Sequence, residues 1–128
     1  LQEAIYSRAE ASNLADVAPY GSSVALFFGR APSDATYPYI VMHQITNEEN
    51  MCFNAASLFR RSLQFTIYDK SEGVAQIYSV RDALRDVFHR KTFVPSVGMW
   101  CTNEVGPLPM DDLWMLHLDF TCYYQEGD

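Results

Sequence analysis

Two segments of the sequence place apolar residues at alternate positions, and this period of two constrains the fold more than any other feature. Phe59–Ile67 alternates apolar residues with Arg, Ser, Gln and Thr, and Leu116–Tyr124 alternates them with His, Asp and Thr. Such alternation is typical of β-strands that turn one face toward a core. The chain is therefore expected to contain an antiparallel sheet in which Leu116–Tyr124 is a long strand.

The region between these strands has the period of a helix. From Glu72 to about Arg90, apolar residues recur every 3.6 positions and charged residues occupy the opposite side, with Ser71 or Asp69 available as the N-cap. We expect the apolar stripe to cover one face of the sheet. It consists of Ile77, Val80, Leu84, Val87 and Phe88.

The remaining elements follow from composition and from turn residues. In chain order, we expect a helix over Gln2 to about Ala15, a buried strand over Val24–Phe28, an irregular connection over Gly29–Pro38, a strand over Tyr39–Thr46, a long loop over Asn47–Ser57, a strand over Phe93–Glu104 and a turn over Gly106–Pro109.

Strands grouped as hairpins with helices between them predict an α+β fold. We expect a mostly antiparallel sheet of about four to five strands with two helices, one of them packed on a sheet face. The length of 128 residues fits a single domain spanning 1–128, and 48% hydrophobic residues are enough for a core. The other sheet face would be covered by solvent, the first helix or another subunit.

Charge and cysteine content exclude several classes of protein. The net charge of −7 disfavours a simple nucleic-acid binder, because phosphate binding needs clustered Lys and Arg. No run of about 18 apolar residues is present, so a membrane partner is not expected. The three cysteines, Cys52, Cys101 and Cys122, form no CxxC pair, which argues against structural zinc and favours a reducing compartment.

No catalytic, metal or cofactor residues emerge from the sequence. His43, His89 and His117 are widely spaced, and the first and last fall on expected strands, where a hydrogen-bonded structural role is favoured. GxSxG, Walker, GxGxxG and EF-hand patterns are missing from the sequence. A nucleophile at Cys52 or Cys101 would need a histidine brought close by the fold. The sequence gives no support to an enzyme.

Aromatic residues are more numerous than one small core needs. The chain has eight Phe, eight Tyr and two Trp, and several fall at polar-facing or loop positions, Tyr123 among them. Because aromatics and Met are enriched at protein interfaces, assembly or docking is the favoured function class. The loop over Asn47–Ser57 would be either an arm that orders on binding or a simple loop tip. The candidate interface residues are Met51, Phe53, Trp100, Trp114 and Tyr37.

The layout as a whole resembles a known family. The segment Phe28–Val41, FGRAPSDATYPYIV, resembles the pattern "G-R-x-P, short spacer, P-Y-hydrophobic" of phage tail terminators, the tail-completion proteins of long-tailed phages, prophages and gene-transfer particles. A strand like Arg61–Asp69, a helix like Gly73–Phe88 and a strand like Trp114–Tyr124 follow in the family's order. The resemblance spans nearly the whole chain, although each motif is short.

This resemblance implies a virion subunit with no catalysis and no cofactor. Such proteins form a hexameric ring on the finished tail tube, end polymerisation of the tube protein and offer a surface to the neck of the head. The implied partners are further copies of the chain, the major tail tube protein and a head-completion protein, with DNA only passing through. Two alternatives stay open: a head-closure protein of the same particle, and a small ligand-binding domain or unrecognised enzyme.

A ring of this kind would give the acidic residues a use. Six copies at −7 each carry −42, and acidic residues at the channel or its rim would keep DNA from adhering. An ordinary acidic solvent surface is the competing interpretation. The candidates lie in two expected loops: Glu48, Glu49, Asp111 and Asp112.

Overall fold

A computed structural model describes residues 2–53, 56–70, 73–93 and 96–126. Side chains are described except at 46–53, 56–58, 96–97 and 125–126. The elements are α1 (Gln2–Glu10), α2 (Leu14–Val17), β1 (Pro19–Tyr20), β2 (Ser23–Val24), β3 (Leu26–Phe28), β4 (Tyr39–Phe53), β5 (Ala56–Asp69), α3 (Ala75–Phe88), β6 (Lys91–Phe93), β7 (Ser96–Met110) and β8 (Leu113–Glu126).

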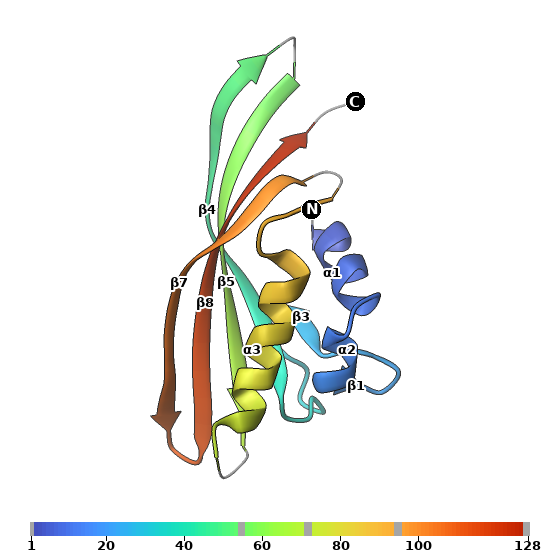
Figure 1. Cartoon of the computed structure of the whole chain (residues 1–128), viewed down its shortest axis with the longest axis vertical. Helices are drawn as coiled ribbons and strands as arrows, with labels where there is room; N and C mark the ends of the chain where they lie inside the picture. Colours follow the sequence, from blue (N-terminus) through green and yellow to red (C-terminus); the bar gives the residue numbers. More distant parts are fainter. Residues whose placement is uncertain (1, 54–55, 71–72, 94–95, 127–128) are drawn as a thin grey trace.

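The fold is α+β and is built on one curled six-stranded sheet in the order β3-β4-β5-β8-β7-β6 (Figure 1). Every pairing in it is antiparallel except that of β3 with β4, and β1 and β2 form a separate two-stranded sheet. The expected antiparallel sheet is therefore present, with more strands than the four to five predicted. The predicted strand over Val24–Phe28 corresponds to β3 (with β2 before it), and the additional strand of the sheet is the three-residue β6.

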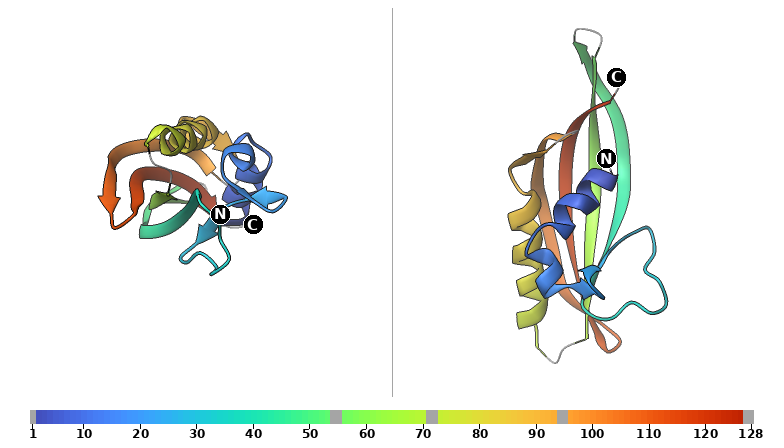
Figure 2. Two further views of the ribbon diagram at one scale, coloured as in Figure 1. Left: turned by 90° about the horizontal axis from the view of Figure 1, so that it is seen from below. Right: turned by 90° about the vertical axis from the view of Figure 1, so that its right-hand side faces the viewer.

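All three helices lie on the same side of the sheet (Figure 2). The predicted helix over Gln2–Ala15 is divided into α1 and α2 at Ser12, whose hydroxyl donates to the Ala9 carbonyl at 2.6 Å and accepts from the Leu14 N–H at 3.1 Å. A serine that bonds to nearby backbone competes with helix continuation, which explains the break. None of the described helices is long and apolar enough to cross a membrane.

The predicted apolar stripe of α3 is buried against the sheet. Three aromatic rings form the centre of this contact: Phe65 stacks on Phe88 at 5.6 Å and meets Phe120 edge-on at 5.3 Å. The helix itself begins later than predicted, since the N-cap position is Val74 and makes no side-chain cap bond. Asp69 ends β5 and is buried, and Ser71 lies outside the described residues.

The predicted loop over Asn47–Ser57 is wrong. At residues 47–53 and 56–57 the backbone instead continues β4 and β5 as a long paired arm, in which Met51 pairs with Leu58 and Phe53 pairs with Ala56 (Figure 1). Residues 54–55 of the predicted loop lie outside the described part of the chain. The polar residues of the arm have low strand propensity, but antiparallel pairing satisfies the backbone groups that face β5, and this overrides the propensity. Cys52 is therefore in a strand as well.

The predicted turn over Gly106–Pro109 is also wrong, because these residues lie inside β7. The chain turns instead at Asp111–Asp112, where Asp111 takes the left-handed φ of 55°. Gly106 has a φ of 117°, and a Cβ there would come within 2.7 Å of the Met115 carbonyl oxygen. The register between β7 and β8 shifts at this point, and the two prolines are tolerated because β7 has a free edge.

Replacing Phe65 tests the core. Phe65→Ala removes a fully buried ring that contacts both Phe88 and Phe120, so we expect a loss of about 3–5 kcal/mol in the free energy of unfolding. Urea denaturation measures it. The control Tyr37→Ala removes a more exposed ring and should cost less than about 1 kcal/mol. Equal losses would contradict this assignment of the core.

Candidate interaction surface

The sheet face opposite the helices has a polar centre whose side chains bond across the strands. Thr66 on β5 lies 2.9 Å from Nδ1 of His117 on β8, and Gln64 Nε2 donates to Oδ1 of Asp119 at 3.1 Å. Asn103 on β7 reaches Oδ2 of Asp119 at 3.5 Å. His117 is thus a hydrogen-bonded residue of the sheet. The row runs over three strands, and its side chains are hydrogen-bonded to one another across them.

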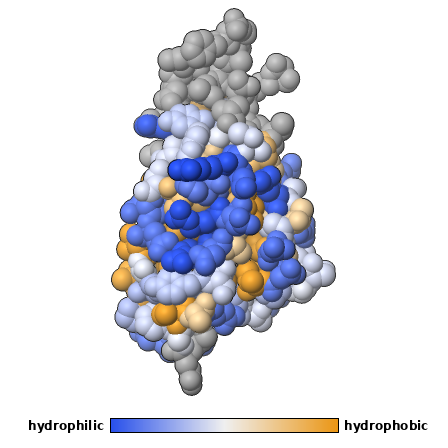
Figure 3. Space-filling view, viewed as in Figure 1, coloured by the Kyte–Doolittle hydropathy of each residue, from blue (hydrophilic) through white to orange (hydrophobic). Residues whose placement is uncertain are grey.

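Exposed apolar side chains gather on β7 at the margin of this face. Trp100 is 41% exposed, packs edge-on to Tyr123 at 6.0 Å, and crosses Gly98, where a Cβ would come within 2.4 Å of its ring. Hydrophobic residues reach the surface along the margin where β7 runs (Figure 3). The other exposed apolar residues of β7 are Val105, Leu108 and Met110, and Ile45 on β4 is exposed as well.

A second aromatic group lies where β3, β4 and β5 meet. The ring of Tyr39 lies 5.2 Å from that of Tyr37, 5.2 Å from that of Tyr68 and 6.2 Å from that of Phe27. Burial, with Tyr37 nearby, raises the pKa of Tyr39, so its hydroxyl stays protonated. Lys70 lies 5.4 Å above the Tyr37 ring. Tyr37 thus has partners within the chain and is still partly exposed.

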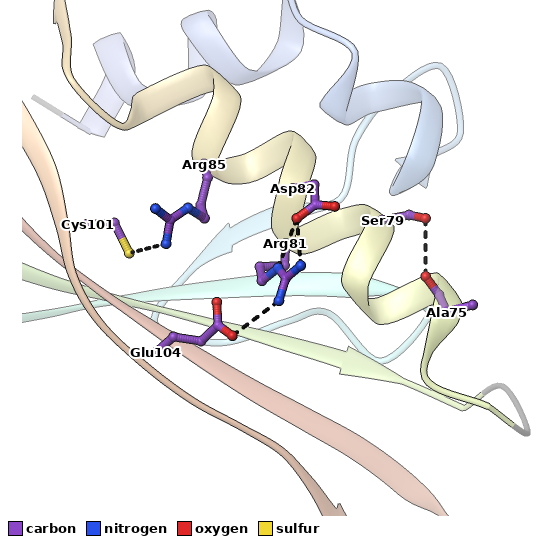
Figure 4. A network of polar contacts seen from close by, with 7 residues as sticks. All are labelled: Ala75, Ser79, Arg81, Asp82, Arg85, Cys101 and Glu104. Atoms are coloured by element: carbon purple, nitrogen blue, oxygen red, sulfur yellow. Dashed lines mark hydrogen bonds and ion pairs between the residues drawn. The ribbon is translucent and has the colours of Figure 1, made fainter.

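Polar contacts also join α3 to β7 on the helix side of the sheet (Figure 4). Arg81 contacts Glu104 on β7 at 3.2 Å and Asp82 at 2.8 Å. Burial opposes the charge of Arg81, but these two carboxylates raise its pKa above the ordinary value. One turn along the helix, the Arg85 guanidinium lies 3.6 Å from the sulfur of Cys101. Helix α3 and strand β7 are therefore joined by an ion pair and a hydrogen bond as well as by packing.

The fold brings a histidine to Cys101, but not in a catalytic arrangement. Nδ1 of His89 accepts a hydrogen bond from the backbone N–H of Cys101 at 2.8 Å, so the ring faces the main chain and not the thiol. Burial raises the pKa of the Cys101 thiol, although Arg85 opposes this effect. A protonated thiol is a poor nucleophile. Within the described residues, groups of three or more His, Cys, Asp or Glu that could hold a metal ion do not occur.

An open groove of about 920 Å³ lies between α1 and α3. Its lining includes Arg8, Asp82, Asp86 and Lys91, and Arg8 Nε already donates to the Val87 carbonyl at 2.7 Å. Charges of both signs line an open surface here, which is unlike the enclosed apolar pockets that take small ligands.

The predicted interface residues do not lie together. Trp100 and Tyr37 are exposed on opposite margins of the sheet, whereas Trp114 packs against the core on the helix side. Met51 and Phe53 lie in the arm, and their side chains are outside the described part of the chain. The sequence missed Ile45, Val105, Leu108 and Met110. On β7, the register shifts change which residues face outward, so the exposure of Val105, Leu108 and Met110 does not follow from simple alternation in the sequence.

The four predicted acidic residues also divide into two sets. Asp111 and Asp112 form the exposed turn between β7 and β8, and Asp112 lies 3.5 Å from Lys70. Glu48 and Glu49 are in strand β4, toward the opposite end of the sheet, and not in a loop as predicted. The strand pairings therefore place the two acidic pairs toward opposite ends of the sheet.

Comparison with known proteins finds a likeness of fold but none of sequence family. The family models searched contain none that matches, and the curated proteins contain no match either. Among solved structures, the fold is similar to that of a chain in the virion of a native gene transfer agent particle, with a TM-score of 0.75 and 16% identity. The similarity covers 98% of this chain and 95% of that chain. At this identity the likeness shows a shared fold.

The contact between His89 and Cys101 predicts a dependence of stability on pH. Burial and the nearby cations Arg85 and Arg90 lower the pKa of His89, so the unfolded chain takes up this proton at a higher pH than the folded chain. The stabilisation is complete above about pH 6.5 and is lost as the pH falls through the lower folded pKa. Urea unfolding at pH 7.5 and 5.5 should therefore show a larger loss for the natural chain than for His89→Gln. Equal losses would contradict the assignment.

Proposed function

We propose that this chain is a structural virion subunit of the tail-terminator kind, which forms a ring on the end of a tail tube. The observation that carries the proposal is the likeness of the fold over nearly its full length to a chain of a gene transfer agent virion. The sequence resemblance to tail terminators, found independently of that likeness, supports the same class of protein.

The residues of the family-like segment occupy a defined place in the fold. Gly29 follows β3 with a φ of 83°, and its N–H donates to the Met42 carbonyl at 2.9 Å. Pro38 is buried directly before β4. The segment is thus the connection between the parallel strands β3 and β4, where a left-handed residue and a fixed φ are both useful. The Gly and Pro of the family-like pattern therefore serve to shape the connection between β3 and β4 in this chain.

In this role the chain acts by geometry and not by chemistry. One face of a ring would match the last ring of the tube, and the other would present a different surface to a head-completion protein, so that growth of the tube stops. A ring of identical subunits requires head-to-tail contacts that close on themselves. The chain would be located in the virion, at the head-proximal end of the tail, after assembly in the host cytoplasm.

Native mass spectrometry with negative-stain imaging tests the proposal. Six copies of 14.6 kDa should give a closed particle of about 88 kDa with a central hole, and its fraction should rise with concentration, with or without magnesium. A chain that stays monomeric up to about 1 mM contradicts the ring. A ring that binds a purified head-completion protein and leaves tail-tube ends uncapped would instead favour the head-closure role.

Charge reversal tests the use of the acidic residues. Replacing Glu48, Glu49, Asp111 and Asp112 together by Lys changes the charge of six copies from −42 to +6, because each copy shifts by +8. We expect DNA to adhere to such a ring and the infectivity of particles to fall at least about tenfold, with gel-shift and transfer assays as readouts. Reversing one pair at a time shows which end matters. Normal transfer by the fourfold variant would contradict a role in DNA passage.

A further inference from the structure

Two long strands of the sheet have a neighbouring strand on one side only over much of their length. β3 covers β4 only at Ile40–Met42, and β6 pairs with β7 only at Ser96 and Met99. Among the strands that the structure describes, residues 43–53 of β4 and 102–110 of β7 therefore have no neighbouring strand on their outer side, and these two edges lie at opposite ends of the strand order β4-β5-β8-β7. At Cys101 the N–H of β7 already donates to Nδ1 of His89. A free edge offers unpaired N–H and C=O groups to a further strand.

We infer that these two edges pair with each other between neighbouring copies, so that β4 of one subunit continues the sheet of the next through its β7. The inference rests on the proposed ring and names the contact that would close it. The partner is a second copy because the edges match in length and in direction. Three successive antiparallel pairings separate β4 from β7, so the two strands run in opposite directions and would meet as an antiparallel pair.

The positions of the two edges along the strands fit a closed ring better than a flat sheet. His43 is level with Asn103, since the first pairs with Gln64, the second with Asp119, and these two with each other. From this level the free part of β4 runs toward the end of the arm, while most of the free part of β7 runs toward the Asp111 turn. If the next copy were added level with the first, as in a flat sheet, residues 43–53 of β4 would lie opposite few of the free residues of β7.

When the sheet closes into a cylinder, each copy is displaced along the strand direction relative to its neighbour, and this displacement can bring the two free parts together. Four strands about 4.8 Å apart are about 19 Å wide, and a strand tilt of about 40° displaces the next copy by about 16 Å, or about five residues. This displacement brings position 48 of β4 opposite position 103 of β7, so that the two free edges face each other over most of their length. The offset seen in the single chain is thus the one that closure requires.

The composition of the edges also favours pairing. Lys and Arg, which commonly protect exposed edges, do not occur in residues 43–53 or 102–110. Ile45 and Val105 are 57% and 42% exposed. The carboxylate of Glu104 is held by Arg81 on the helix side, which reduces its repulsion of an acidic neighbour. Pro107 and Pro109 lack N–H donors and the Cys101 N–H is bonded to His89, so hydrogen bonding on β7 is expected mainly over residues 102–106.

Hydrogen exchange read by mass spectrometry tests the inference on the natural chain. Monomer and ring are separated and exchanged under the same conditions. Backbone amides that face outward in residues 43–53 and 102–106 should exchange at least about tenfold more slowly in the ring, whereas amides of the interior strand β8 should change little. A ring in which both edges exchange as fast as in the monomer overturns this inference and leaves the ring itself standing.

Charged substitutions provide the second test. Ile45→Lys and Val105→Lys place a cation on each edge at exposed positions, so the monomer should keep its thermal midpoint while the ring fraction falls at least about tenfold. The matched control is Thr121→Lys, on the same face but on the interior strand β8, which should still form rings. Loss of rings in the control alone would overturn edge pairing in favour of a face contact. A natural chain without rings up to about 1 mM would overturn the proposed function and this inference together.

Discussion

The antiparallel register between β5 and β8 decides what each face of the sheet presents. Phe65 pairs with Leu118 and Leu63 with Phe120, which places these residues under α3, while Thr66 with His117 and Gln64 with Asp119 form the polar row on the other face. A slip of one residue in one strand would exchange its two sets of side chains and bury its polar ones beneath the helix. The core and the helix-free face thus depend on one register.

Much of this arrangement can be predicted from sequence where a pattern repeats without interruption. The stripe of α3 and the alternation of β8 could be predicted because each residue's face follows directly from its number. The arm could not be predicted, since the residues around Glu48 have little strand propensity and take their conformation from pairing with β5. Strong local turn residues at Gly106–Pro109 similarly gave way to a turn at Asp111, which only the strand pairing specifies.

The candidate surface was harder to predict than the fold for a related reason. Between β7 and β8 the register shifts three times, and each shift changes the relation between residue number and sheet face. Trp100 is recognisable as an exposed aromatic from its type and its neighbours, but Val105 and Leu108 look like ordinary strand residues until the bulges are known. Trp114, next to the β7–β8 turn, is partly buried against the core, so its residue type alone does not tell how much of it reaches the surface.

In a ring closed through β4 and β7, the position of the helices would decide which face lines the channel. A helix layer is about 10 Å thick and needs more circumference than the strands, so it fits best on the outside. The helix-free face would then turn inward and present the row of Gln64, Asp119 and Asn103, whose hydrogen bonds are already made within the sheet. Within this row Asp119 contributes one negative charge per copy, and its carboxylate accepts from both amide side chains. A row with this charge favours the passage of a polyanion over its adhesion.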